Sequence, residues 1–389
     1  MGVMVFVFFA FSLFAFDHGV SGKSIARVED FELEQQLKQL NKPFVKSIQR
    51  KDGRIYDCVL INKQPAFDHP KLKYHVLQMR PTSFPQGLKL HDESSTLTST
   101  YLEELEDGGC PIETVPIKRI LKEDLIRTKS LSGIHPLTQD RGGSHYANTT
   151  NRIPFGDGYY GAQAIIGIYN PSVSYGQASE VMISISNGPP LNNIDVGWTV
   201  NPILYGDYRT RLFTRWTGSH NTGCYNTNCP GFVQTNNKIP LDNHLWPIST
   251  YGGDQHGLAF SIFQNNETND WWLNIGGSTL GYWPASLFDS LSTNATSIVW
   301  GGATHSPVAA IYKAQMGSGR FPDEGYGKAC FFSHIQLVNE KTSNVFTEPS
   351  FVTTSADKPL CYNVNGNAKI GDGTGYSFFF GGPGGICGY

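Results

Sequence analysis

Short runs of alternating apolar and polar residues fill most of the chain beyond residue 155. They read "GAQAIIGIYNPSV", "SEVMISISNGP", "TRLFTRWTG", "GLAFSIFQN", "DWWLNIGG" and "FFSHIQLVN", and Gly, Asn and Pro separate them. Neighbouring residues on a strand face opposite sides, so this alternation predicts strands with one buried face, joined by turns. We therefore predict an all-β fold, an antiparallel β-sandwich, over residues 155–389.

The pattern before residue 129 is different. "EDFELEQQLKQLNKPFVKSIQR", residues 29–50, has helical periodicity that is interrupted near Pro43, and "YDCVLINKQPAFDHP" is strand-like with prolines. We predict a small α+β pro-region over residues 23–128. The apolar stripe of its helix consists of Phe31, Leu33, Leu37 and Leu40.

Two further segments belong to neither pattern. "MGVMVFVFFAFSLFAF" is an apolar run that Asp17 and His18 end before it could span a bilayer, so residues 1–22 are predicted to be a secretory signal peptide. Residues 129–154 are rich in Ser, Gly, Asn and Thr without apolar periodicity, and they are predicted to be a linker that holds the maturation site.

Secretion makes the 7 cysteines candidates for disulfides. Pairing neighbours in the sequence would give Cys58–Cys110, Cys224–Cys229 and Cys361–Cys387 and leave Cys330 over as a buried structural thiol, although the sequence alone leaves other connectivities open. N-x-[ST] sequons agree with a secreted, extracellular glycoprotein, and they begin at Asn148, Asn266 and Asn294.

Composition removes several classes of function. The formal net charge of −3 provides no basic field for nucleic acid or for an anionic membrane. The chain contains no H-E-x-x-H, G-x-S-x-G or Walker sequence, so zincin, serine-hydrolase and P-loop chemistry lack their usual motifs. We expect a monomer that binds no metal, no cofactor, no nucleic acid and, after signal removal, no membrane.

Several longer motifs carry a resemblance to a known family. "DCVLINKQPAFDHPKLKYHVLQMRP" and "CPIETVPIKRILKEDLIR" resemble the activation peptide of the neprosin family, and "IDVGWTVNPILYGDYRTRLFTRWT", "GCYNTNCPGFVQTNNKIPLD", "GYWPASLF" and "GRFPDEGYGKACFF" resemble its catalytic domain. The resemblance implies a secreted zymogen of a glutamic-type endopeptidase on a β-sandwich. Such enzymes cut after proline at acidic pH and need no metal or organic cofactor, so proline-containing peptides or proteins are the implied partners.

Two glutamates are the implied catalytic pair, one in a motif I/V-E-x-G-W and one directly after W-G-G. One carboxylate takes a proton from the attacking water while its partner donates one to the leaving amine. This chain departs from the pattern at both positions: "NNIDVGW" places Asp195 at the first, and "VWGGATH" places Ala303 at the second. Asp195 keeps a shorter carboxylate, whereas Ala303 has no proton to give. The resemblance therefore predicts a degenerate dyad and weak or absent peptidase activity.

Other residues could replace the missing glutamate. His305 would share a strand face with Ala303 and could act with Asp195, and Gln234 in "GFVQT" could orient water beside a carboxylate. Either could equally be a hydrogen-bonded structural residue, and Asp254 with His256 in "YGGDQHG" is interpreted as a solvated turn. An active, rewired acid endopeptidase and an extracellular peptide-binding pseudopeptidase are the alternative functions. The aromatic residues Trp198, Tyr225 and Trp300 would suit a proline-rich peptide, and each could equally belong to the core of the sandwich.

Overall fold

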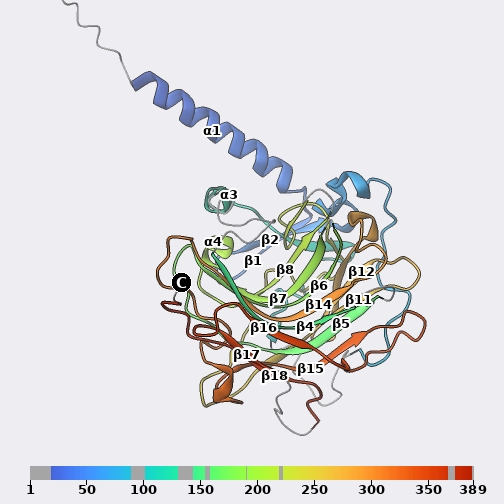
Figure 1. Cartoon of the computed structure of the whole chain (residues 1–389). Helices are drawn as coiled ribbons and strands as arrows, with labels where there is room; N and C mark the ends of the chain where they lie inside the picture. Colours follow the sequence, from blue (N-terminus) through green and yellow to red (C-terminus); the bar gives the residue numbers. More distant parts are fainter. Residues whose placement is uncertain are drawn as a thin grey trace, which may run out of the picture.

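The strands of the protein form a sandwich of two large antiparallel sheets, with a smaller sheet beside them (Figure 1). The computed structural model describes residues 19–88, 101–129, 143–153, 158–189, 191–218, 222–366 and 373–387. Residues 1–18 of the predicted signal peptide therefore lie outside the described residues. The predicted fold class, a mostly β protein with an α+β region at the N-terminal end, is confirmed.

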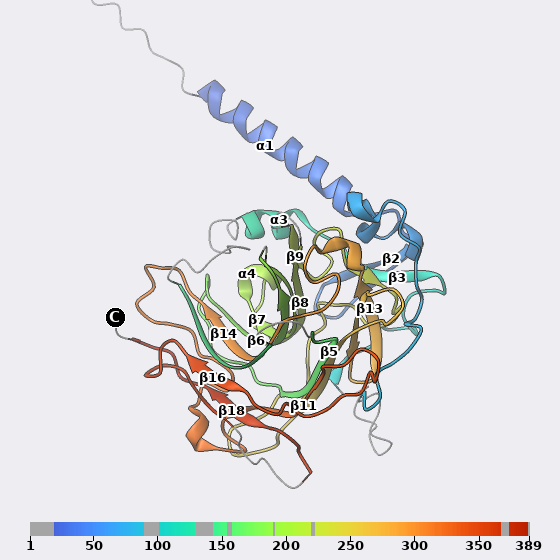
Figure 2. The same cartoon turned by 45° about the vertical axis from the view of Figure 1, so that its right-hand side comes forward.

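The first large sheet has seven strands in the described residues, and Figure 2 shows several of them curving side by side. β14 lies between β4 and β6, and β7 continues the sheet toward β8. In sheet order the strands are β16 (Thr353–Ala356), β4 (Ser144–Arg152), β14 (Ser297–His305), β6 (Ala178–Asn187), β7 (Asn192–Val200), β8 (Arg211–Thr217) and β9 (Gly223–Tyr225).

The second large sheet has eight strands in the described part of the chain, and all the C-terminal alternating runs of the sequence fall in one of these two sheets. In order its strands are β10 (Val233–Gln234), β13 (Ser278–Trp283), β12 (Trp271–Ile275), β11 (Gly257–Gln264), β5 (Gly161–Gly167), β15 (Cys330–Val338), β18 (Phe378–Gly381) and β17 (Asn363–Asn365).

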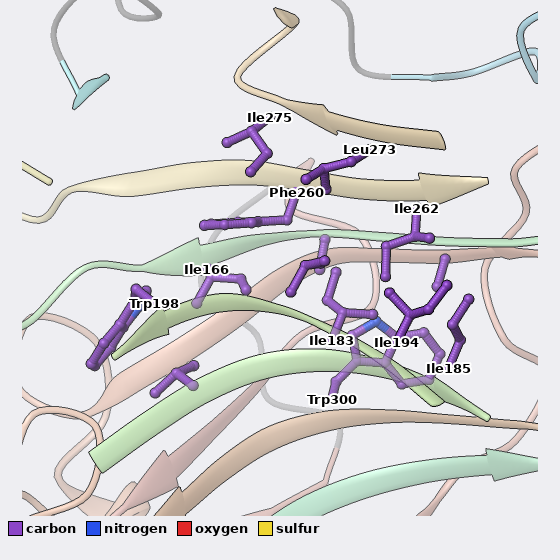
Figure 3. Packing of buried hydrophobic residues seen from close by; sticks show 14 of the residues in the cluster. Ile166, Ile183, Ile185, Ile194, Trp198, Phe260, Ile262, Leu273, Ile275 and Trp300 are labelled. Atoms are coloured by element: carbon purple, nitrogen blue, oxygen red, sulfur yellow. The ribbon is translucent and has the colours of Figure 1, made fainter. Parts of the chain in front are cut away.

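The hydrophobic core lies between the two large sheets (Figure 3). Each strand contributes alternate residues to it, as the period of two requires. From the eight-stranded sheet Phe260 and Leu273 point inward, and from the seven-stranded sheet Ile183, Trp198 and Trp300 do so, all completely buried. The residues between these inward positions therefore face the opposite side of the seven-stranded sheet, which we call the outer face.

The pro-region forms the third sheet, made of β1 (Lys46–Gln49), β2 (Ile55–Leu60) and β3 (Thr114–Lys118). Two helices flank it in the sequence, α1 (Gly19–Leu40), which extends away from the sheets in Figure 1, and α3 (Lys122–Lys129). No helix in the described residues combines the length and apolarity needed to cross a bilayer.

The predicted helix over residues 29–50 is partly wrong. The helix ends at Leu40, before Pro43, and residues 46–49 form β1 instead. Proline disfavours helical backbone at the residue before it, so the helix does not continue past Pro43, and Ile48 is buried from a strand instead. Of the predicted stripe Leu33 is buried but Phe31 is 61% exposed, because α1 contacts the protein along little of its length.

The pro-region is packed into the sandwich rather than tethered beside it. Leu72, Tyr101 and Leu102 belong to the main hydrophobic core. The side-chain amide of Gln64 donates to the carbonyl oxygen of Gln234 at 3.0 Å and accepts from the backbone N–H of Gln234 at 2.8 Å. The side chain of Gln64 thus makes the two hydrogen bonds that the backbone of a neighbouring strand would make to β10, the first strand of the eight-stranded sheet.

The predicted linker is shorter than residues 129–154. Residues 144–152 form β4, an interior strand that pairs with both β14 and β16. The sequence pattern did not reveal this strand because most of its buried side chains are polar. Thr149 and Asn151 are 0% and 4% exposed, and only Ala147 is a buried apolar residue. Residues 130–142 of the predicted linker and its maturation site lie outside the described residues.

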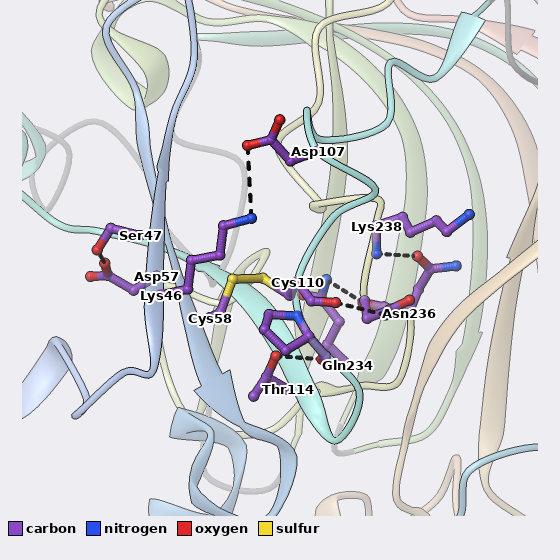
Figure 4. Close-up of a disulfide and its surroundings, with 12 residues drawn as sticks. Lys46, Ser47, Asp57, Cys58, Asp107, Cys110, Thr114, Gln234, Asn236 and Lys238 are labelled. Carbon is purple, nitrogen blue, oxygen red and sulfur yellow. Dashed lines mark hydrogen bonds and ion pairs between the residues drawn. A yellow bond between two sulfur atoms is a disulfide. The ribbon is translucent and has the colours of Figure 1, made fainter.

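All three predicted disulfides are present in the structure: Cys58–Cys110, Cys224–Cys229 and Cys361–Cys387. Figure 4 shows the first of them, which joins β2 of the pro-region to the segment that precedes β3. Cys330 is a free thiol, fully buried on β15, where burial raises its pKa above the usual range. This agrees with its interpretation as a structural residue.

The glycines of the two family motifs are required by close packing around Met182. Met182 on β6 pairs with Gly197 on one side and with Gly301 on the other. A Cβ at Gly197 would lie 1.9 Å from the carbonyl oxygen of Val181, and one at Gly301 would lie 2.5 Å from that of Ala147. Both positions therefore need the absence of a side chain.

We predict that Gly301→Ala destabilises the protein by about 1–3 kcal/mol, because the added methyl group forces strands β14 and β4 apart. The measurement is equilibrium denaturation followed by tryptophan fluorescence. Gly366→Ala is the matched control: Gly366 is exposed, and its added Cβ would meet only the Thr354 methyl group, at 3.1 Å. Equal midpoints for Gly301→Ala and the unchanged chain would contradict the packing argument.

A second prediction concerns the contact between the pro-region and the sandwich. The Tyr56 hydroxyl donates to Oδ1 of Asp242 at 2.7 Å, and both residues are buried. Tyr56→Phe leaves this carboxylate without that donor and should cost about 1–3 kcal/mol in denaturant unfolding of the intact chain. Tyr74→Phe, at a pro-region tyrosine that is 85% exposed, should change little. A loss of the same size in both variants would show that the buried contact is not the cause.

Candidate active site

The two positions of the expected dyad lie on the outer face of the seven-stranded sheet. Asp195 alternates with the core residues Ile194 and Val196 on β7, and Ala303 follows Gly301 on the same face of β14. Asp195 is 1% exposed and Ala303 is 9% exposed. Alternation along β7 and β14 thus places both positions on the outer face.

The Asp195 carboxylate is held by its neighbours. Its Oδ2 accepts from Nε of Arg215 at 2.7 Å and from Nδ2 of Asn193 at 2.8 Å. Arg215 is the residue paired with Asp195 across β7 and β8, so the backbone register itself brings the two charges together. The pair fixes the orientation of the carboxylate in the sheet.

A second carboxylate lies on the same face, that of Glu180 on β6. In the strand register Glu180 stands directly beside Ala303. It is completely buried, and its carboxylate oxygens have three neighbours: Nη1 of Arg215 at 3.5 Å, the hydroxyl of Tyr225 at 3.0 Å and Nε2 of His305 at 3.4 Å. The face thus has two carboxylates, but the second comes from the strand next to the expected position.

Arg215 connects these two carboxylates. Burial lowers its pKa, but the neighbouring Tyr225, Asp195 and Glu180 outweigh this and raise the pKa of Arg215 well above its usual value. Burial and the Glu180 charge also raise the pKa of Tyr225 well above its usual value, so this phenol keeps its proton and donates it.

His305 completes the cluster at the end of β14. Its Nδ1 lies 2.8 Å from the hydroxyl of Ser144, its cross-strand neighbour on β4, and its Nε2 faces Glu180. The pair expected from the sequence was Asp195 with His305. The structure joins Asp195 to Arg215 instead and joins His305 to Glu180.

A short helix covers part of this face. α4 (Pro202–Tyr205) packs Leu204 and Tyr205 against Phe213 and Tyr225, with Met182 at the margin of the cluster. This apolar cover helps to explain why charged groups on the outer face of a sheet are buried. Buried charges need partners, and the cluster described above supplies them.

Gln234 lies in the other large sheet, on β10. Its side-chain Nε2 donates to the carbonyl oxygens of Asn236 and Ile239, at 3.3 and 3.1 Å, and Figure 4 shows it beside the loop that carries Cys110. These hydrogen bonds stabilise the turn after β10, in agreement with the alternative that Gln234 is a hydrogen-bonded structural residue. Asp254 is exposed in the turn before β11, where the sequence predicted a solvated turn.

The burial of the three aromatic residues agrees with the alternative that they are core residues. Trp198 and Trp300 are completely buried in the core between the sheets, and Tyr225 is only 7% exposed, under α4. Strand alternation directs the two tryptophans of the motifs into the core. The sequon residues Asn148, Asn266 and Asn294 are all partly exposed.

Sequence reasoning missed three members of the cluster, Ser144, Glu180 and Arg215, and it considered Tyr225 only as a candidate peptide-binding or core residue. A signal existed for Glu180, because in "SEVMISIS" it is the one charged residue, and it precedes the inward positions Val181 and Ile183. Its proximity to Ala303 depends on the pairing of β6 with β14, which are more than a hundred residues apart in the sequence. Alternation within one strand does not reveal that register.

Two family models match the chain. The model described as "Neprosin" matches residues 175–383, and the model described as "Neprosin activation peptide" matches residues 47–152. The first covers more than half of the 389 residues. The second extends through β4, so the family's activation segment and the seven-stranded sheet share this strand.

Solved structures of low similarity also match the chain. Scytalido-glutamic peptidase with a peptide-based transition-state analogue is 10% identical, with a TM-score of 0.36, and the alignment covers 61% of this chain and 97% of that one. The apo Crh5 transglycosylase is 13% identical, with a TM-score of 0.19, covering 43% of this chain and 70% of that one.

We predict that Arg215→Met costs about 3–5 kcal/mol near neutral pH, because it leaves Asp195 and Glu180 as buried carboxylates without their shared cation. Urea denaturation of both chains near neutral pH tests this.

Arg209→Met, at an exposed arginine close in sequence, is the control and should change stability by less than about 0.5 kcal/mol. A loss of stability in Arg215→Met no larger than that in Arg209→Met would contradict the prediction.

Proposed function

Because the chain belongs to the neprosin family, we propose that it is a secreted zymogen of the glutamic-peptidase type whose family dyad at Asp195 and Ala303 no longer supports efficient peptide cleavage. The implied substrates are proline-containing peptides. The family match and the packed activation peptide support the zymogen, and the three disulfides fit an oxidising compartment outside the cell. The dyad proposal depends on the chemistry of the outer face.

The single observation that carries the proposal is the pairing of Asp195. A general base must accept a proton from water, and its partner must return one to the leaving amine. Oδ2 of Asp195 already accepts from Arg215 and Asn193, and Ala303 has no titratable group to act as the partner. The aspartate also has a shorter reach than glutamate, and displacement of a reacting group by about 1 Å can cost on the order of a hundredfold in rate.

Glu180 does not restore the dyad. Its carboxylate is completely buried and lies among Tyr225, Arg215 and His305, so it is used as the anion of this cluster. It also opposes a simple reversion: a glutamate at position 303 would stand directly beside Glu180, and like charges at opposed strand positions destabilise a sheet. The charge arrangement around position 303 therefore disfavours a second glutamate there.

The test is hydrolysis of a fluorogenic proline-containing peptide at acidic pH, with the purified protein before and after cleavage of the linker. We expect turnover no higher than that of Asp195→Asn, an isosteric change that removes the carboxylate. Asp195→Glu/Ala303→Glu/Glu180→Gln restores both glutamates while it removes the adjacent like charge and keeps a hydrogen-bonding side chain beside Tyr225. This variant should gain activity by at least on the order of a hundredfold.

The double variant Asp195→Glu/Ala303→Glu, which keeps Glu180, is the matched comparison and should gain less. Turnover by the unchanged chain that Asp195→Asn abolishes would overturn the proposal. Such a result would mean that the aspartate works with another proton carrier on the outer face.

A further inference from the structure

Three residues on adjacent strands form a relay at the end of the outer face. Ser144 on β4, His305 on β14 and Glu180 on β6 follow each other across the sheet. The Ser144 hydroxyl lies 2.8 Å from Nδ1 of His305, and Nε2 of the same ring lies 3.4 Å from Oε2 of Glu180. A hydroxyl, an imidazole and a carboxylate in this order are the parts of an activated nucleophile.

The surrounding contacts determine the direction of the hydrogen bonds. Tyr225 donates its hydroxyl proton to Oε1 of Glu180, and the Arg215 guanidinium lies 3.5 Å from Oε2, so Glu180 is the acceptor of the group. The Nε2–H of His305 then donates to Glu180. This tautomer leaves the lone pair of Nδ1 facing Ser144, whose hydroxyl donates to it.

Burial differs along the relay. Glu180 is completely buried, whereas the His305 side chain is 17% exposed and Ser144 is half-buried. The carboxylate is thus fixed inside the protein, and both the imidazole and the serine are partly exposed. Ser144 and His305 are cross-strand neighbours in the register of β4 and β14, and rigid strands hold such a pair more precisely than loops do.

We propose that Ser144 is a nucleophile for acyl transfer from ester or peptide carbonyl groups, with His305 as its general base and Glu180 as the positioning residue. Oγ of Ser144 forms a bond to the carbonyl carbon while its proton passes to Nδ1 of His305. Collapse of the tetrahedral adduct breaks the bond to the leaving alcohol or amine, which takes that proton. Water then hydrolyses the acyl-enzyme by the same transfers in reverse order, releasing the acid and the free serine.

This activity is separate from the family dyad. It uses neither the Asp195 carboxylate nor position 303 in a bond-making step, and it goes beyond the function proposed above. Its serine also lies outside any G-x-S-x-G sequence, which is why the motif search of the sequence passed over it.

A fluorophosphonate probe tests the proposal, because an activated serine displaces fluoride from phosphorus and keeps a covalent phosphonyl group. The folded chain, both intact and cleaved in the linker, is incubated with the probe and analysed by intact mass and peptide mapping. We expect one adduct on Ser144 in at least one of the two forms. Ser144→Ala should abolish it, and His305→Gln should slow labelling by at least on the order of a hundredfold.

Ser184→Ala is the matched control, because Ser184 is a half-buried serine on the outer face of β6 that pairs with Asp195 in the register. It should label like the unchanged chain. Glu180→Gln keeps a hydrogen-bond acceptor for His305, so it should slow labelling less than His305→Gln does. Circular dichroism of each variant identifies any that fail to fold.

Absence of a Ser144 adduct in both forms of the folded, unchanged chain would overturn the proposal, and so would equal labelling rates for the unchanged chain and a folded His305→Gln variant. The readout is independent of peptide cleavage at acidic pH. The relay can therefore fail while the proposed loss of the family dyad stands, and the reverse also holds.

Discussion

The guanidinium of Arg215 is the interaction on which the outer face of the seven-stranded sheet depends. Burying two carboxylates on a sheet surface is unfavourable unless a cation and hydrogen-bond donors accompany them. Arg215 pairs with Asp195 through the register of β7 and β8, and its Nη1 reaches toward Glu180. The position of this one cation thus determines how both acidic groups are oriented and which of their atoms remain available for chemistry.

The same arrangement links the family motifs to one another. Gly197 and Gly301 flank Met182 on β6, where strands approach too closely for a side chain. Alternation along the same strands directs Trp198 and Trp300 into the core. These motif residues therefore meet packing requirements that hold whether or not a carboxylate stands at position 303. Similarity in these motifs therefore indicates a shared fold more strongly than it indicates a shared catalytic activity.

The sequence was sufficient for those features that a single strand or segment determines. Alternating runs predicted the β-sandwich, and pairing each cysteine with its sequence neighbour anticipated the three disulfides, although the sequence left other connectivities open. It failed for β4, whose buried positions are largely Thr and Asn, and for the helix that stops at Leu40 before Pro43.

The candidate site was predictable only in part, for a related reason. Asp195, Ala303 and His305 could be assigned to one face from local pattern. Glu180 and Ser144 could not, since they reach this face through the pairing of distant strands, and strand register is a property of the assembled sheet rather than of any short segment.

The side chain of Gln64 covers an edge strand that removal of the pro-region would expose. Its amide satisfies both backbone groups of Gln234 on β10, the outermost strand of the eight-stranded sheet in the described residues. An unpaired sheet edge is a template on which other extended chains assemble, and proteins protect such edges with covering segments. Here the cover belongs to the pro-region. Proteolytic removal of the pro-region would expose β10 to strand addition by another molecule. While it is in place, the pro-region therefore prevents self-association at this edge.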